Sequence, residues 1–291
     1  MKRLRTGVIA RCATLAVALT VTPSALAPVV ADTPVSTAAK SGSRATAAQT
    51  YGWGKALWDF AWEFGESFDS RPYRGSDITA GRWIERTDGT GRVVKYGGGV
   101  EFHSALVRNG TDEPDVGGST LTLVDQPADR GRWEIIERSY QYEHDARDYT
   151  FLLELIPADP DGYDCGAHNL TIARVSPGDD RVTVGVNAGS AAWDRTFQGF
   201  RQNGTSHTYA VEVTGRRITW FIDGRSVASV DARAAIPQVP MTVRMRLVSD
   251  GPAEMNKSVV KVDWVRSYDL ERGKVPPRGA DLVKGTRDDA C

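Results

Sequence analysis

The sequence predicts an all-β protein, built as a two-sheet antiparallel β-sandwich of the jelly-roll type. Short stretches in which apolar and polar residues alternate follow one another along most of the chain. Turn-forming segments such as PADRG, PADPDG and SPGDD separate them, and helical periodicity is nearly absent beyond residue 70. Strands that succeed one another without crossover helices pair antiparallel, and many of them in one domain pack as two layers.

Ten stretches carry this strand pattern. In chain order they are STLTLVDQ (119–126), GRWEIIERS (131–139), DYTFLLELIP (148–157), HNLTIARV (168–175), DRVTVGVNAG (180–189), SHTYAVEVTG (206–215), RRITWFIDG (216–224), RSVASVD (225–231), MTVRMRLVS (241–249) and VVKVDWVRSY (259–268). The segments between them are rich in Gly, Pro, Asp and Ser, which favour turns. The stretch YGWGKALWDFAWEFGESFD (51–69) is dense in aromatic residues, and we expect these to be core rather than a platform for sugars.

The first residues have the features of a secretory signal peptide, residues 1–31. A basic start is followed by the apolar run Cys12–Val21 and by small-residue cleavage patterns that end at Ala27 and Ala31. The run is shorter than the ~20 residues that cross a bilayer, so the alternative of a membrane anchor is disfavoured. We expect a flexible leader over residues 32–50, one domain over 51–272 and a C-terminal tail over 273–291.

The charge pattern excludes some partners. The chain has a formal net charge of −1, and its leader carries four basic residues and no acidic ones, so the remainder is more acidic still. Without a basic stripe we expect no nucleic-acid partner. Without a second apolar span we expect a soluble, extracellular protein, and we expect it to be a monomer.

Two cysteines remain after the signal peptide, Cys165 and Cys291. A pair of cysteines in an exported protein suggests a disulfide between the tail and the loop before residue 168, and two unpaired thiols are the alternative. The four histidines have no metal-ligand spacing, so we expect no zinc site.

The stretch HTYAVEVTGRRITWFIDGRSVASVD (207–231) resembles a strand–turn–strand unit of family 16 glycoside hydrolases, the laminarinase and lichenase group. GRWEIIERS, LLELIP and VVKVDWVRSYD resemble three further strands of the family, in its order along the chain, and WEFGESFD is similar to its opening segment. The resemblance covers roughly residues 55–270. It implies a concanavalin A-like jelly roll with a cleft for an extended polysaccharide, and no required cofactor.

The family's chemistry lies on one strand with the pattern Glu-x-Asp-x-Glu. Alternate residues of a strand share a face, so two glutamates can approach to about 5–5.5 Å, the separation that a retaining glycosidase needs. The resemblance places Asn169, Thr171 and Ala173 at these positions, with Leu170 and Ile172 toward the core. An amide and a methyl group can neither form a glycosyl ester nor donate a proton, so the loss should lower the rate by many orders of magnitude.

Other residues could supply chemistry. Glu154, beside Leu152 on its strand face, is a candidate cleft acid, with a salt-bridged structural role as the alternative. Glu134 is expected in an ion-pair ladder with Arg132 and Arg138. His168 near Asp164 is a candidate base. The segment SYQYEHDARDY contains the residue types that a polysaccharide lyase uses, at Tyr140, Tyr142, His144 and Arg147.

Glycan binding needs only aromatic rings, amides and hydroxyl groups, whereas hydrolysis also needs a pair of acids. Trp193, in the expected loop GSAAWDRTFQGFRQNG (189–204), and Asn187 just before it are candidate glycan-binding residues. The resemblance also suggests a structural calcium ion at Asp263. We therefore expect a polysaccharide-directed protein that is a non-catalytic or altered glycan binder. An active endo-glycosidase or lyase with other acids, and a structural or interaction protein of the cell envelope, are the alternatives.

Overall fold

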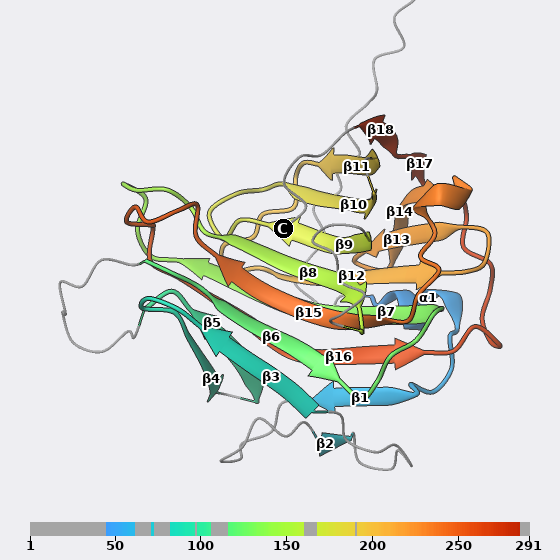
Figure 1. Ribbon diagram of the computed structural model, residues 1–291, viewed down its shortest axis with the longest axis horizontal. Coiled ribbons are helices and arrows are strands. Elements are labelled where there is room, and N and C mark those ends of the chain that lie inside the picture. The colour runs from blue at the N-terminus through green and yellow to red at the C-terminus, as the bar shows by residue number, and fades with distance from the viewer. Residues whose placement is uncertain are drawn as a thin grey trace, which may run out of the picture. The chain divides into compact units, whose positions relative to one another are not determined.

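The computed structural model describes residues 45–61, 71–72, 82–96, 98–105, 116–159, 168–189 and 191–285. Nearly all of them lie in strands and turns, which form two sheets packed face to face (Figure 1). The predicted all-β sandwich is therefore confirmed, and each of the ten predicted stretches contains a strand. No helix in this described part is long and apolar enough to cross a bilayer.

The first sheet has ten strands. Its order is β17 (Ala280–Asp281), β14 (Arg225–Val230), β13 (Ile218–Ile222), β12 (Ser206–Val213), β7 (Gly131–Gln141), β16 (Ser258–Tyr268), β1 (Trp58–Ala61) and β2 (Arg71–Pro72), with β5 (Gly99–His103) on β16 and β4 (Arg92–Tyr96) on β5. All of its pairings are antiparallel except that of β14 with β17.

The second sheet has eight strands, all paired antiparallel. Its order is β18 (Val283–Gly285), β11 (Ala191–Phe197), β10 (Val182–Ala188), β9 (His168–Val175), β8 (Thr150–Pro157), β15 (Met241–Val248), β6 (Ser119–Val124) and β3 (Arg82–Thr87). In Figure 1 this sheet lies toward the viewer, with β8 and β9 in its middle. Its inner face packs on the first sheet and its other face, which we call the outer face, points away from the core.

The core fills the space between the two inner faces. Alternate apolar residues of β8 (Phe151, Leu153, Leu155) meet those of β12 and β13 (Tyr209, Val211, Trp220) in one buried cluster. Such a core forms because each strand turns every second side chain to the same face. The aromatic stretch near the N-terminus belongs to the interior, as expected: Trp53, Trp58 and Phe60 are buried. Trp62, Phe64 and Phe68 lie outside the described residues.

The ordered domain begins earlier than residue 51, the predicted start. Helix α1 (Ala47–Tyr51) follows Thr46, whose hydroxyl accepts a hydrogen bond from the Gln49 amide while the Gln49 side chain accepts one from the Thr46 amide. This reciprocal capping box stabilises the first turn of a helix. The end of the predicted flexible leader is therefore a helix. The signal peptide lies outside the described residues and stays a prediction.

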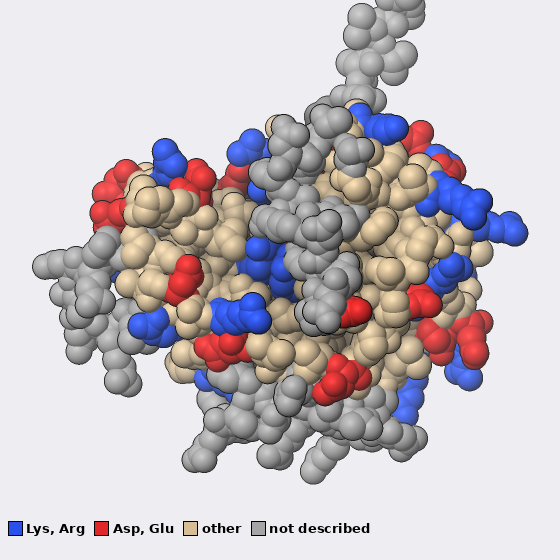
Figure 2. Space-filling view, in the orientation of Figure 1, with Lys and Arg blue, Asp and Glu red and all other residues tan. Residues whose placement is uncertain are grey.

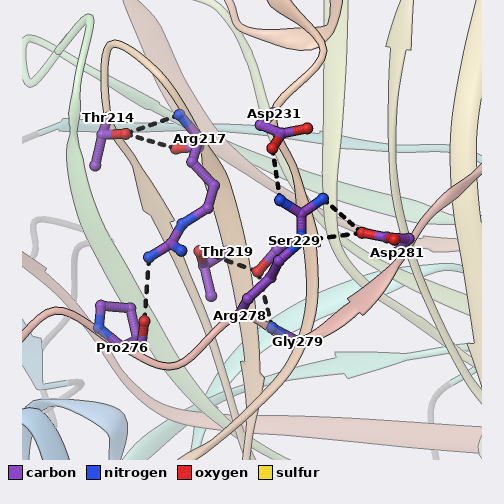
Figure 3. A network of polar contacts seen from close by, with 9 residues as sticks. All are labelled: Thr214, Arg217, Thr219, Ser229, Asp231, Pro276, Arg278, Gly279 and Asp281. Atoms are coloured by element: carbon purple, nitrogen blue, oxygen red, sulfur yellow. Dashed lines mark hydrogen bonds and ion pairs between the residues drawn. The ribbon is translucent and has the colours of Figure 1, made fainter.

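The C-terminal tail contains strands, which its sequence did not suggest. Figure 3 shows how the tail is attached. Arg278 donates hydrogen bonds to the carboxylates of Asp231 and Asp281, and Arg217 donates one to the carbonyl of Pro276. After these contacts β17 pairs with β14 at the edge of the first sheet, and β18 pairs with β11 at the edge of the second. The tail thus covers one edge of each sheet, which protects them from pairing with other chains. Cys165 and Cys291 lie outside the described residues.

Two buried glutamates of β7 have raised pKa values. The expected ion-pair ladder at Glu134 is wrong: its carboxylate accepts hydrogen bonds from the amides of Ala47 and Ala48 at the start of α1. Burial nevertheless raises the pKa of Glu134 to about 7. Glu137 is buried beside Ser139, whose hydroxyl donates to it, and burial raises the pKa of Glu137 to about 8. Arg132 pairs with Glu212 instead.

These glutamates predict that stability falls as the pH rises. In the unfolded chain Glu137 loses its proton near its ordinary pKa of 4.5, whereas the folded chain holds that proton until about pH 8. Raising the pH through this window therefore favours unfolding, by up to about 1.4 kcal/mol per pH unit for one proton. Between pH 7 and 8, urea unfolding of the wild type should show this loss, and Glu137→Gln should show a smaller one, to which only Glu134 contributes. The exposed Glu271→Gln is the control, and an equal slope in all three proteins would contradict the assignment.

Candidate functional site

Strand β9 lies in the middle of the second sheet, between β8 and β10. Its first outward residues are Asn169 and Thr171, as the sequence predicted, while Leu170 between them belongs to the core. Asn169 lies directly opposite Asn187 of β10, and Thr171 lies opposite Glu154 of β8. The alternation therefore holds through the first half of the strand.

A β-bulge changes the second half of β9. The register shifts by one residue next to Ile172 and Ala173, against both β8 and β10. Ala173 consequently lies opposite the core residue Leu153 and is itself buried in the core, so the expectation that it faces outward is wrong. Arg174 takes the third outward position and is exposed. A bulge inserts one extra residue and so reverses the faces beyond it.

The bulge is joined to the opposite sheet by a hydrogen bond. The indole N–H of Trp220, on β13, donates to the backbone carbonyl of Thr171 across the core, at 2.8 Å. Trp220 is completely buried, so both its N–H and this carbonyl need a partner inside the protein. This hydrogen bond stabilises the local backbone geometry in which Arg174, rather than Ala173, points outward.

Glu154 is held by two arginines. Its Oε2 accepts from the Nε atoms of Arg244 and Arg246, each at 3.0 Å, and its Oε1 accepts from Arg246 at 3.3 Å. The residue is only 3% exposed. Both carboxylate oxygens are therefore occupied by structural ion pairs, which is the alternative that the sequence left open.

The outer face has no close pair of carboxylates among the described strand residues. Glu154 of β8 and Asp194 of β11 lie in one line across the sheet, through Thr171 and Gly185. Three strand spacings separate them, about 14 Å. Retaining and inverting glycosidases need separations of about 5–5.5 Å and 6.5–9.5 Å respectively. The described residues of this face do not form the paired acids of a hydrolase.

Asn169 and Asn187 form a buried amide pair on the outward side of β9 and β10. The Oδ1 atom of Asn187 accepts no hydrogen bond from the described residues, although its side chain is only 3% exposed. A buried acceptor of this kind is costly unless a donor reaches it. The assignment of Asn187 as a glycan-binding residue stays a prediction.

Trp193 does not lie in a loop. The stretch predicted as a loop contains β11, and Trp193 lies opposite the core residue Val186 and is buried in the core. A ring in this position packs between the sheets and cannot stack on a sugar at the surface. The signal for this strand was weak, because polar and apolar residues alternate irregularly over AAWDRTF (191–197).

The remaining candidates do not join the site. His168 starts β9, and burial lowers the pKa of its imidazole. Its proposed partner Asp164 lies outside the described residues. Asp263 lies 3.5 Å from the ammonium group of Lys261, and no group of three His, Cys, Asp or Glu residues suited to a metal occurs in the described part of the chain. The calcium ion at Asp263 stays a prediction, and the described residues provide no cluster of three such side chains to bind it.

The residues suggested for lyase chemistry are dispersed. Tyr140 stacks on Tyr142 near the end of β7, in the other sheet. His144 contacts Gln141, and Arg147 pairs with Asp250 at the surface. None of them reaches the outer face around β9 through a contact that the structure describes.

The chain was compared with known families and structures. Residues 186–266 match the model of the glycosyl hydrolases family 16. No curated protein matches the sequence.

Solved laminarinases have the same fold. That of Rhodothermus marinus is 15% identical with a TM-score of 0.55, over 76% of this chain and 98% of its own. That of Flavobacterium sp. UMI-01 is 12% identical with a TM-score of 0.56, over 74% of this chain and all of its own. The catalytic domain of an endo-1,3-β-glucanase from Thermotoga petrophila RKU-1 is 10% identical with a TM-score of 0.55, over 75% and 98%.

The Trp220 contact predicts a specific loss of stability. Trp220→Phe keeps an aromatic ring but leaves the buried Thr171 carbonyl without its donor, which should cost about 1–3 kcal/mol. Trp53→Phe is the matched control, because the indole N–H of Trp53 is buried and has no hydrogen-bond partner among the described residues. Urea unfolding should show the larger loss in Trp220→Phe, and equal losses would count against the bond.

The ion pairs of Glu154 predict a second effect. Glu154→Gln removes the carboxylate that Arg244 and Arg246 both bind, and loss of one partner of a buried pair costs about 3–5 kcal/mol. Asp250→Asn, which breaks the exposed pair with Arg147, should cost less than about 1 kcal/mol. Thermal and urea unfolding measure both. A loss in Glu154→Gln no larger than that in Asp250→Asn would mean that these pairs do not stabilise the sheet.

Proposed function

We propose that this chain, which has the jelly-roll fold of family 16 glycoside hydrolases, is a secreted protein that binds a polysaccharide without hydrolysing it. The family match and the laminarinase neighbours support a glycan-directed role. The ligand would lie on the outer face of the second sheet, across β6, β15, β8, β9 and β10. The observation that carries the proposal is the chemistry of this face.

The outward residues of β9 cannot supply acid and base catalysis. They are Asn169, Thr171 and Arg174. A guanidinium group stays protonated at any physiological pH, and an amide or a hydroxyl is a poor acid and a poor base. The one carboxylate opposite them, Glu154, is bound by Arg244 and Arg246. This arrangement supports binding rather than bond cleavage.

The same face is suited to bind sugars. Hydroxyl groups of Thr120 and Thr122 on β6 and of Thr183 on β10 lie on it, half-buried and beside charged neighbours. A hollow of about 350 Å³ at its β3–β6–β15 end is lined by Arg86, Thr120 and Val248, among others. Its volume falls within the usual range for small-ligand sites.

Two assays on the purified mature protein test the proposal. A panel of β-glucans, galactans and uronans should yield neither new reducing ends nor unsaturated products. The protein should nevertheless be retained by at least one of these polysaccharides in affinity electrophoresis. Thr120→Trp, which fills the face beside the hollow, should lose most of this retention, because the polysaccharide can no longer approach β6.

Arg216→Trp is the matched control, because Arg216 is exposed in the turn between β12 and β13, in the other sheet. Turnover of any polysaccharide would overturn the non-catalytic role. Absence of retention on the whole panel would overturn glycan binding and favour a protein partner in the cell envelope.

A further inference from the structure

We propose that the ligand is an acidic polysaccharide, whose carboxylate or sulfate groups bind a row of arginines that crosses the outer face. This inference rests on the proposed function and names the class of its ligand. The row consists of Arg86 on β3, Arg246 on β15 and Arg174 on β9, and we call it the arginine row.

The strand pairings place these three residues in one line. Arg86 and Arg246 both lie opposite Thr120 of β6. Arg246 and Arg174 both lie opposite Leu152 of β8. Directly opposed residues of antiparallel strands point to the same side of the sheet, so all three arginines share the outer face.

The spacing of the row is regular. One strand separates each arginine from the next, which corresponds to about 10 Å between neighbouring backbone positions. A line of cations at a constant interval matches a polymer that carries an anionic group at a constant interval along its length. A compact anion would occupy only one of the three positions.

The arginine row is also accessible on this face. Arg86 and Arg174 are exposed, and Arg246 is half-buried. The next line on β8 and β9 contains Glu154 and Thr171, both of which are buried. A long polymer that lies across the sheet therefore meets the arginines first.

Arg86 and Arg174 are not neutralised within the described residues. No described carboxylate lies within ion-pair distance of either of them. Some other exposed arginines do have such partners: Arg147 pairs with Asp250, and Arg278 with Asp231 and Asp281. Arg246 pairs with Glu154, so among the described residues the unpaired charges of the row are those of Arg86 and Arg174. The row thus keeps an excess of positive charge on a chain whose formal net charge is −1.

The molecular surface is consistent with this excess of positive charge. Figure 2, which views the second sheet from outside, shows Lys and Arg side chains near the middle of this face, beside uncharged residues. The hollow at the Arg86 end gives one sugar ring a place beside the first arginine. The acid that lines it, Asp88, accepts a hydrogen bond from the amide of Gly118 at 2.5 Å. Arg guanidinium groups bind carboxylate and sulfate through two parallel hydrogen bonds.

Affinity electrophoresis of the full mature protein tests the class of ligand. The gels contain polygalacturonate (carboxylates), dextran sulfate (sulfate esters) or neutral laminarin, each at low and at 0.5 M salt. We expect retention on at least one of the two acidic polymers, weakened by salt because ions screen exposed charges, and little retention on laminarin. The acidic polymer with the stronger retention identifies carboxylate or sulfate as the recognised group.

The variants test the row itself. Arg174→Ala should weaken binding to the acidic polymer roughly tenfold, because one hydrogen-bonded charge contact is lost, and Arg174→Glu should weaken it further. Arg216→Ala removes the same charge from the other sheet and should have little effect. Urea unfolding checks that the Arg174 variants fold.

Each other outcome counts against the inference. Equal losses in Arg174→Ala and Arg216→Ala would reduce the effect to net charge and overturn it. Retention on laminarin alone would overturn the acidic ligand and leave the proposed glycan binding intact. Retention on none of the three polymers nor on the wider panel would overturn both.

Discussion

The outer face of this protein depends on one irregularity of the backbone, the bulge of β9 at Ile172 and Ala173. The buried indole of Trp220 donates its hydrogen bond to the carbonyl of Thr171, at the start of the bulge. Because side chains alternate along a strand, a single extra residue exchanges the faces of everything that follows. The bulge places the methyl group of Ala173 in the core and the guanidinium group of Arg174 on the surface.

This exchange changes the chemistry of the strand. Without the bulge, the third outward group would be alanine, and the strand would present only an amide and a hydroxyl. With it, Arg174 joins Arg246 and Arg86 in a line across three alternate strands. The strand to which the sequence resemblance assigns the family's paired acids thus has a cation at its third outward position. A positive side chain neither attacks an anomeric carbon nor protonates a leaving oxygen, but it binds anions well.

Charged groups inside the protein serve its architecture. Glu134 accepts hydrogen bonds from two amides at the start of α1, Glu154 joins β8 to β15 through two arginines, and Arg132 pairs with Glu212 between β7 and β12. Each is buried, and a buried charge is tolerated only where hydrogen bonds satisfy it. Glu154, the acid that the sequence offered as a candidate for catalysis, therefore forms structural ion pairs in the sheet. The C-terminal tail has a comparable role at the edges, where β17 and β18 extend both sheets.

The sequence by itself determined the fold class, the ten strands with regular alternation and the lack of acidic residues in the strand at 168–175, because these depend on local residue patterns. It missed β1 to β5, β11, β17 and β18, which are short or carry charged and polar residues on both faces. One local signal pointed to the bulge, the consecutive apolar residues Ile172 and Ala173 before Arg174, but two apolar neighbours also occur in regular buried strands. Only the tertiary structure decided that Ala173 and Trp193 face the core and that Arg86, Arg174 and Arg246 share one line. The direction of each side chain and the alignment of the three arginines depend on the register between strands that are far apart in the chain. No single segment of the sequence encodes that register.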